Sequence, residues 1–152
     1  MSTTFSTDST ANATPLTLDS ALSAQVHVLG DALRSKGWTV SSAESCTGGG
    51  VAFAFTSVAG SSDWFNQSWV TYSNDAKRSV LGVTEQTLKE YGAVSKQTVK
   101  EMAEGVRRNS GAQLVVTVSG IAGPGGGSGA GRATGGRGGG TRRTAWAAPA
   151  GR

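Results

Sequence analysis

Ala43-Glu44-Ser45-Cys46-Thr47-Gly48-Gly49-Gly50 is the most informative stretch of the sequence. It follows the short apolar run 38–40 and precedes the apolar run 51–55, so the pattern predicts a turn from a buried strand into a helix. The first N–H groups of a helix have no partner inside it, and glycine lets a ligand approach the backbone closely. This turn therefore suits an anion or a developing oxyanion, although a capped helix entered through a flexible turn is the alternative.

The segments on either side alternate between helical and strand patterns. Apolar residues recur at three- and four-residue spacing, or sit behind capping residues, in five predicted helices: 18–36, 48–56, 75–81, 84–91 and 95–108. Strands are predicted at 38–43, 67–72 and 114–118. This order predicts a three-layer α/β/α domain with a largely parallel sheet, in which ligands bind at the carboxyl ends of the strands. Ser45, Ser119 and the turn 72–77 all fall at such ends.

The charge is distributed unevenly along the 152 residues. The net charge is +4, but residues 129–152 hold five arginines and no acidic residue, so residues 1–128 carry nine Lys or Arg against ten Asp or Glu. The basic character belongs to the tail and not to the domain. We therefore do not expect a nucleic acid as partner, and we leave open assembly into a homo-oligomer.

Cysteine and histidine are scarce, with Cys46 and His27 as the single examples. One cysteine forms no internal disulfide, and the pair argues against a structural metal site, so we expect neither metal nor cofactor. We expect His27 to be a packed or surface residue. Residues 1–17 look like a disordered leader without a signal peptide, and no run reaches the length of a membrane span. A cytoplasmic protein with no membrane partner is the expectation.

Three motifs in order resemble one known family. They are residues 43–49, the stretch Val70-Thr71-Tyr72-Ser73-Asn74-Asp75-Ala76-Lys77, and the stretch 118–127 with its glycines. Together they are similar to the C-terminal domain of CinA, the family of PncC-type nicotinamide-nucleotide amidohydrolases. The resemblance covers residues 18–128. It implies hydrolysis of the carboxamide of nicotinamide mononucleotide to nicotinate mononucleotide and ammonia.

The resemblance also implies roles for individual residues. Ser45 would be the nucleophile and Lys77 the base, with Tyr72 relaying the proton or orienting the lysine and Ser119 completing the hydroxyl network. The N–H groups of residues 46–48 would bind the oxyanion. The residues expected to bind substrate are Thr47, Gly48, Gly49, Asn74, Gly120, Gly123, Gly125 and Gly126.

Each role has an alternative. Cys46 is the rival nucleophile, because a helix N-terminus lowers the pKa of a thiol. Lys77 lies next to Arg78 and could be an ordinary solvated residue, and Tyr72 could be a half-buried strand aromatic. For Lys77 to act as a base near pH 7, its pKa must fall from about 10.4 through burial or a neighbouring positive potential.

The family pattern stops after Ser128, where Gly, Ala and Arg predominate. These residues have GC-rich codons. If the codons of residues 133–140 are read one nucleotide later, they permit the sequence Gln-Pro-Val-Gly followed by a run of valines. We hypothesise a frameshift near codon 129, so the C-terminal strand and helix of the family would be missing and 129–152 would be a disordered tail. The rival is a genuine Arg/Gly-rich tail that binds single-stranded nucleic acid. The alternative function is an inactive remnant or nucleotide-binding module.

Overall fold

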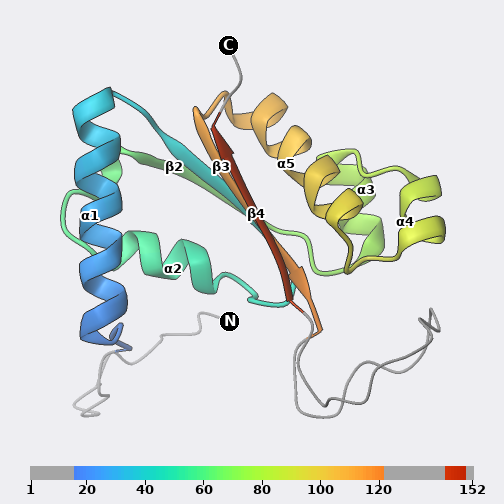
Figure 1. Cartoon of the computed structure of the whole chain (residues 1–152), viewed down its shortest axis with the longest axis horizontal. Helices are drawn as coiled ribbons and strands as arrows, with labels where there is room; N and C mark the ends of the chain where they lie inside the picture. Colours follow the sequence, from blue (N-terminus) through green and yellow to red (C-terminus); the bar gives the residue numbers. More distant parts are fainter. Residues whose placement is uncertain (1–15, 122–142, 150–152) are drawn as a thin grey trace, which may run out of the picture.

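The computed structural model describes residues 16–121 and 143–149 (Figure 1). Most of the predicted leader, residues 1–15, lies outside these ranges, as do residues 129–142 and 150–152 of the predicted tail. The expectations of disorder, of a frameshift and of a nucleic-acid-binding tail therefore remain predictions for these residues. Within the described ranges, no helix is long and apolar enough to cross a membrane.

Helices and strands alternate as the sequence pattern predicts, with ends that differ by a few residues. The helices are α1 (Ser20–Lys36), α2 (Gly50–Thr56), α3 (Asn74–Leu81), α4 (Glu85–Tyr91) and α5 (Lys96–Ser110), with the short 3-10 helix η1 (Ser61–Asp63). The strands are β1 (Val40–Glu44), β2 (Phe65–Val70), β3 (Leu114–Gly120) and β4 (Arg143–Pro149). Side-chain caps from Ser73, Thr84 and Ser95 begin α3, α4 and α5.

The four described strands form one sheet in the order β2-β1-β3-β4. β1 lies in the centre and pairs in parallel with both β2 and β3. The carboxyl ends of these three strands therefore meet at one edge of the sheet, as expected for a largely parallel α/β sheet. This arrangement brings the end of each strand, and the turn that follows it, to the same place.

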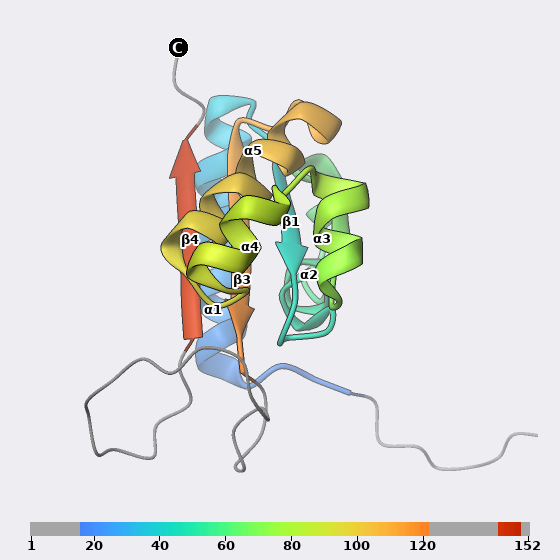
Figure 2. The same cartoon turned by 90° about the vertical axis from the view of Figure 1, so that its right-hand side faces the viewer.

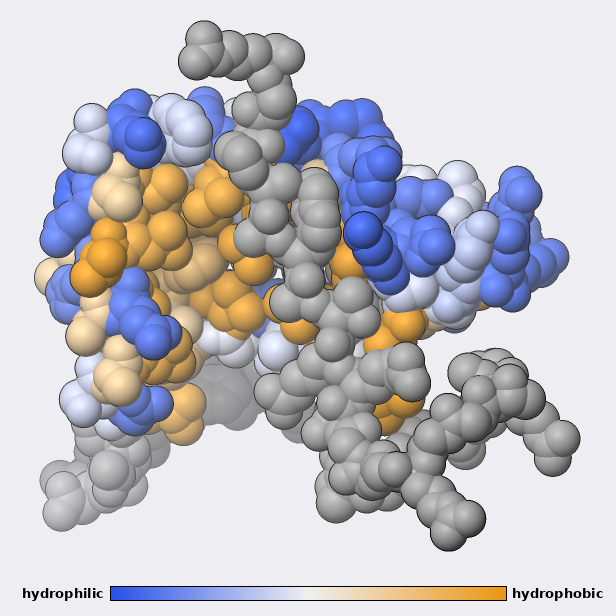
Figure 3. Space-filling model, viewed as in Figure 1, coloured by the Kyte–Doolittle hydropathy of each residue, from blue (hydrophilic) through white to orange (hydrophobic). Residues whose placement is uncertain are grey.

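The helices cover both faces of the sheet (Figures 1 and 2). α1 and α2 lie on one face around a cluster of buried residues that includes Leu33, Phe55 and Trp64, and α3, α4 and α5 lie on the other face around a cluster that includes Leu81, Met102 and Val115. Hydrophobic residues are visible at the surface between α1 and the strands (Figure 3). The three-layer α/β/α class is confirmed.

β4 is a correction to the predicted tail. Residues Arg143–Pro149 were expected to be disordered, but they pair antiparallel with β3 in seven registered positions, from Leu114 with Pro149 to Gly120 with Arg143. The reason is tertiary. β3 presents an unpaired row of N–H and C=O groups on its outer edge, and an extended segment free of glycine can satisfy them without any strong strand pattern of its own. The prediction of disorder is wrong for these seven residues.

α3 is held against α5 by a close crossing and two side-chain bonds. A Cβ atom placed on Gly105 of α5 would lie 2.1 Å from the carbonyl oxygen of Leu81, so only glycine fits at the crossing. Arg108 donates to the same Leu81 oxygen at 2.9 Å, and Asn109 donates to the carbonyl of Val80 at 2.9 Å. These bonds satisfy carbonyls at the C-terminal end of α3 that have no partner within the helix.

Candidate active site

Ser45 and Lys77 meet at the carboxyl edge of the sheet. The Nζ atom of Lys77 donates to Oγ of Ser45 at 3.1 Å, and the two side chains come from different elements, 32 positions apart in the chain. Ser45 directly follows β1, and its backbone N–H donates to the carbonyl of Val118 in β3 at 2.9 Å. Lys77 lies in the first turn of α3. The pairing that the resemblance implied is therefore present in the structure.

Lys77 is almost fully enclosed. Its residue surface is 1% exposed, and Ser45 is 6% exposed. Besides Ser45, Nζ donates to the backbone carbonyls of Thr71 and Tyr72, both at 2.9 Å. Burial lowers the pKa of the Lys77 ammonium from its ordinary value, because a charge is less stable away from water, while the neighbouring Cys46 acts in the opposite direction. The solvated surface lysine that the sequence left open is therefore excluded.

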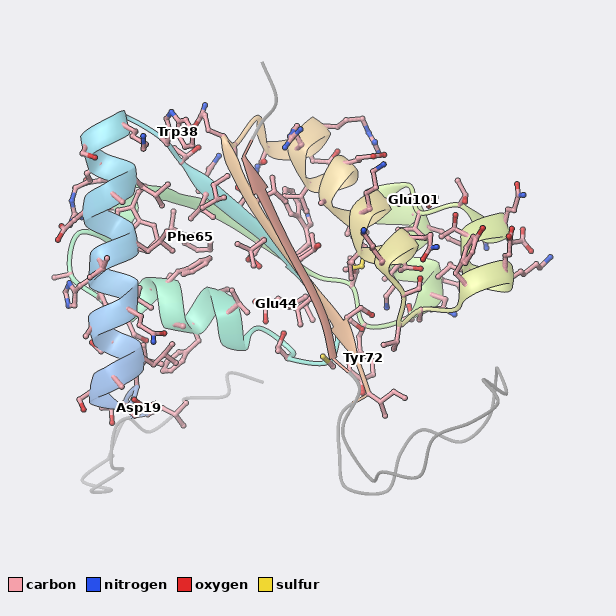
Figure 4. The ribbon with its side chains drawn as sticks, viewed as in Figure 1. Asp19, Trp38, Glu44, Phe65, Tyr72 and Glu101 are labelled. Carbon is pink, nitrogen blue, oxygen red and sulfur yellow. The ribbon has the colours of Figure 1, made fainter. Side chains whose placement is uncertain are left out.

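Tyr72 contributes its backbone and not its ring to this contact. The residue is 66% exposed, and the acceptor that holds Lys77 is its carbonyl oxygen. Figure 4 shows Tyr72 at the same end of the sheet as Glu44. The phenol makes no hydrogen bond with any residue that the structure describes. Its predicted part in proton relay remains a prediction.

Ser119 lies in β3 beside the site but points its hydroxyl elsewhere. Oγ of Ser119, 1% exposed, donates to the carbonyl of Ala93 at 2.7 Å, in the loop before α5. No bond joins it to Ser45 or Lys77 within the described ranges. The expected hydroxyl network therefore does not include Ser119 in this structure, because its proton is used to tie β3 to the segment between α4 and α5.

The turn between β1 and α2 has most of its N–H groups occupied. Gly48 donates to the carbonyl of Ser45 at 3.1 Å, and Gly50 donates to the carbonyl of Thr47 at 3.0 Å. The φ angles of Gly48 and Gly49 are +58° and +105°, values that favour glycine. The N–H groups of Cys46 and Thr47 find no acceptor among the described residues. Two of the three N–H groups expected to bind an oxyanion thus remain available, and that of Gly48 does not.

Glu44 is the residue that the sequence analysis missed. It is fully buried, and its carboxylate accepts hydrogen bonds from the hydroxyl of Thr47 and from the backbone N–H groups of Gly49, Val51 and Ala52. A protein carboxylate therefore occupies the helix N-terminus that we expected to be open to an anion. The available signal was an acidic residue at the end of a buried strand, where charged side chains are rare unless they are partnered.

Of the remaining predicted substrate residues, two lie at the carboxyl edge of the sheet and three lie outside the described residues. Asn74 is exposed at the start of α3, and Gly120 ends β3 at the same sheet edge. Gly123, Gly125 and Gly126 lie outside the described residues.

His27 is exposed on α1, as expected for a residue without a catalytic role. The two described cavities, of about 440 and 520 Å³, lie beside α3 and α4 and are lined by neither Ser45 nor Lys77, so the candidate site rests on side-chain geometry.

This geometry can support nucleophilic chemistry. A serine hydroxyl in contact with a buried amine of lowered pKa is the arrangement of a nucleophile with its base. Two unoccupied backbone N–H groups follow the serine directly, where they can receive a developing oxyanion. Cys46 is half-buried, and no hydrogen bond joins its thiol to a base among the residues that the structure describes, whereas Ser45 contacts Lys77 directly. The geometry therefore favours Ser45 over Cys46.

Several curated proteins with similar sequences carry the name of one activity, and others are named CinA-like protein. "Nicotinamide-nucleotide amidohydrolase PncC" of Enterobacter agglomerans is 61% identical over 100 residues, which cover 66% of this chain and 61% of that protein. The protein of the same name from Escherichia coli K12 is 52% identical over 110 residues, 72% of this chain and 67% of that one. The chain thus spans about three-fifths to two-thirds of the length of these relatives.

Solved structures agree with the sequence matches. The competence/damage inducible protein CihA from Agrobacterium tumefaciens superposes with a TM-score of 0.71 at 46% identity, over 76% of this chain and 69% of that chain. The competence damage-inducible protein A from Klebsiella pneumoniae gives a TM-score of 0.69 at 39% identity, over 70% and 66%.

The family model for the CinA C-terminal domain matches residues 22–139. It continues past Ser128, where we expected the resemblance to stop. The match covers well over half of the sequence, and the strand-end site lies inside it. By its sequence, its fold and its relatives, this chain belongs to the CinA C-terminal domain family.

Proposed function

We propose that this chain is an amidohydrolase that converts the carboxamide of nicotinamide mononucleotide to nicotinate mononucleotide and ammonia. The observation that carries the proposal is the 3.1 Å contact between Lys77 Nζ and Ser45 Oγ in a buried setting that lowers the pKa of the lysine. The names of the PncC relatives support the substrate class. The proposed mechanism uses Ser45 as nucleophile and Lys77 as base, with no cofactor.

In the proposed mechanism Lys77 acts as a neutral amine, and its three contacts are compatible with that form. A neutral amine has two N–H donors and one lone pair, and the carbonyls of Thr71 and Tyr72 supply two acceptors at 2.9 Å. The lone pair then faces Ser45, and the Ser45 hydroxyl donates to it. In the ammonium form the same contact would have Lys77 as the donor. Because both N–H donors are already engaged, the amine is oriented for proton transfer before the substrate arrives.

The chemistry proceeds in two half-reactions. Oγ of Ser45 attacks the carboxamide carbon as Lys77 takes its proton, and the negative charge on the carbonyl oxygen is received by the N–H groups of Cys46 and Thr47. Lys77 returns the proton to the leaving nitrogen, so ammonia departs and an acyl-enzyme ester remains on Ser45. Water, with Lys77 again as base, then releases nicotinate mononucleotide and restores the hydroxyl.

The other predicted residues enter this proposal as substrate contacts. Gly48 and Gly49 lie in the turn after Ser45, Asn74 begins the helix that carries Lys77, and Tyr72 is exposed beside its own carbonyl that holds Lys77. The glycine-rich segment that begins at Gly120, the last residue of β3, is proposed to bind the phosphate through its N–H groups. A cytoplasmic location and assembly into a homo-oligomer stay predictions.

A non-catalytic nucleotide-binding module is the second candidate. The observation behind it is that the chain spans 61% of the length of the Enterobacter agglomerans relative, so part of that protein has no counterpart in the matched region. Under this alternative the mononucleotide binds without turnover, and Ser45→Ala leaves binding unchanged.

The test is ammonia release from nicotinamide mononucleotide by the purified full chain. We expect turnover that is lost in both Ser45→Ala and Lys77→Ala, since each variant removes one partner of the 3.1 Å contact. Arg78→Ala is the matched control, because Arg78 is the next residue on α3 and is exposed. Binding without ammonia release in a folded sample would instead favour the nucleotide-binding module.

A further inference from the structure

The Glu44 carboxylate is the most heavily bonded side chain near the site. One oxygen accepts from the hydroxyl of Thr47 and from the N–H groups of Gly49 at 3.1 Å and Val51 at 2.9 Å, while the other accepts from the N–H of Ala52 at 2.8 Å. Figure 4 shows Glu44 beside the N-terminal end of α2. Both oxygens are therefore satisfied by one short turn of the chain.

These bonds account for a fully buried acidic residue. Glu44 is 0% exposed, and no ion pair among the described residues includes it. A buried carboxylate is costly unless hydrogen bonds or an opposite charge compensate it. Here the compensation comes from the N–H groups of the first turn of α2 and from the positive end of the helix dipole. The same bonds leave that helix end with no open N–H group for a substrate phosphate.

The turn held in this way contains the site. Glu44 directly precedes Ser45. Its carboxylate binds Thr47 and Gly49, which lie between the nucleophile and α2, and so fixes the backbone of this turn. Within this turn, the N–H groups of Cys46 and Thr47 are the ones with no acceptor in the described ranges. The carboxylate thus takes up the surrounding donors, and the two N–H groups directly after Ser45 keep no acceptor among the described residues.

We infer that Glu44 is a positioning residue that shapes the oxyanion-binding turn by anchoring it to α2. This inference rests on the proposed nucleophilic role of Ser45, but it does not depend on which amide is hydrolysed. Glu44→Gln would place an amide N–H against at least one backbone N–H donor, that of Ala52 if the amide oxygen keeps the other three bonds, so we expect the turn to shift. The contacts of Lys77 with Ser45, Thr71 and Tyr72 come from other atoms and would remain.

The test measures the reactivity of Ser45 separately from amide hydrolysis. Full-length protein is treated with diisopropyl fluorophosphate, which forms a bond from phosphorus to Ser45 Oγ and releases fluoride, and labelling is followed by intact mass and peptide mapping. The rate constant per folded molecule is measured across pH for wild type, Glu44→Gln and Thr47→Val. Thr47→Val removes one of the four bonds and is the milder variant in case Glu44→Gln does not fold.

Glu101→Gln is the matched control. Glu101 also accepts from the start of a helix, from the N–H of Thr84 at 2.7 Å and from the hydroxyl of Thr87 at the beginning of α4. It lies on α5, on the opposite side of the sheet from α2 (Figure 4). Losing it removes a comparable carboxylate anchor without touching the turn after Ser45.

We expect Glu44→Gln to slow labelling of Ser45 about a hundredfold, the usual effect of losing an oxyanion donor, and Thr47→Val to slow it severalfold. The pH midpoint should stay at the wild-type value, and Glu101→Gln should label at the wild-type rate. Wild-type rates in both Glu44→Gln and Thr47→Val, or a moved pH midpoint, would overturn the inference. Labelling of wild type without ammonia release would refute the proposed substrate and leave this inference intact.

Discussion

Replacing Gly105 with alanine should separate Lys77 from Ser45 without touching either residue. The new Cβ would lie 2.1 Å from the carbonyl oxygen of Leu81, and 2.8 Å from its carbonyl carbon and Cα. All three are backbone atoms, so no side-chain rotation can relieve the overlap. Reaching even 3.0 Å, below which real Cβ atoms essentially do not approach other atoms, requires α3 and α5 to part by about 0.9 Å.

The expected cost in stability is about 1 to 3 kcal/mol, the range for overpacked cores. The effect on activity should be larger, because α3 carries Lys77 one turn before Leu81. Arg108 donates to the same Leu81 oxygen, so the displaced helix also loses its C-terminal anchor. A 1 Å misplacement at a reacting group can lower the rate about a hundredfold. We therefore expect Gly105→Ala to lose about two orders of magnitude in kcat.

The assay pairs urea unfolding with ammonia release per folded molecule, with Ser45 labelling as the substrate-independent readout. Gly30→Ala is the matched control, because its Cβ would lie 2.7 Å from Nε1 of the buried Trp64 on the other face of the sheet. It should lose stability but keep kcat. The reasoning is refuted if Gly105→Ala is as stable as wild type, or if it is destabilised and retains full activity.

Three further outcomes are expected. Because burial lowers the pKa of Lys77, the unfolded chain binds more protons than the folded chain between that lowered pKa and 10.5. The free energy of unfolding in urea should therefore rise for wild type relative to Lys77→Met as pH rises through this window. A difference between the two proteins that stays constant with pH would contradict the burial argument. Tyr72→Phe keeps the carbonyl that holds Lys77, so the pH midpoint of kcat should not move; a shift would reveal a phenol in the proton path. Ending the chain at residue 142 removes β4 and bares the outer edge of β3, so light scattering should detect more aggregation and calorimetry a lower Tm than in the full chain.

Most elements and the location of the site could be predicted from sequence, because their causes are local. Apolar spacing determined the helices, and capping residues such as Ser73 and Ser95 fixed where they begin. The apolar strand before Ser45 and the glycines after it predicted a strand-to-helix turn, and the alternation of elements placed three strand ends together. The confirmed family followed from the three motifs.

Other features depended on contacts between distant segments. Composition gave no reason to expect a strand at 143–149, since its pairing depends on the free edge of β3. Ser119 sits at the predicted strand end, but the nearest acceptor for its hydroxyl is the carbonyl of Ala93. The helix N-terminus that looked open to an anion is filled by Glu44, whose reach depends on how β1 meets α2.

Local sequence patterns were enough to place the site residues at the carboxyl edge of the sheet, because periodicity, capping and turn chemistry act over a few neighbours. What those residues can do chemically depends on contacts between segments that are distant in the chain. A lysine can act as a base when packing removes it from water. A backbone N–H can bind an oxyanion when no acceptor of the protein is bound to it. Both conditions are set by atoms that the chain brings together from far apart, as when Lys77 meets Ser45 across 32 positions.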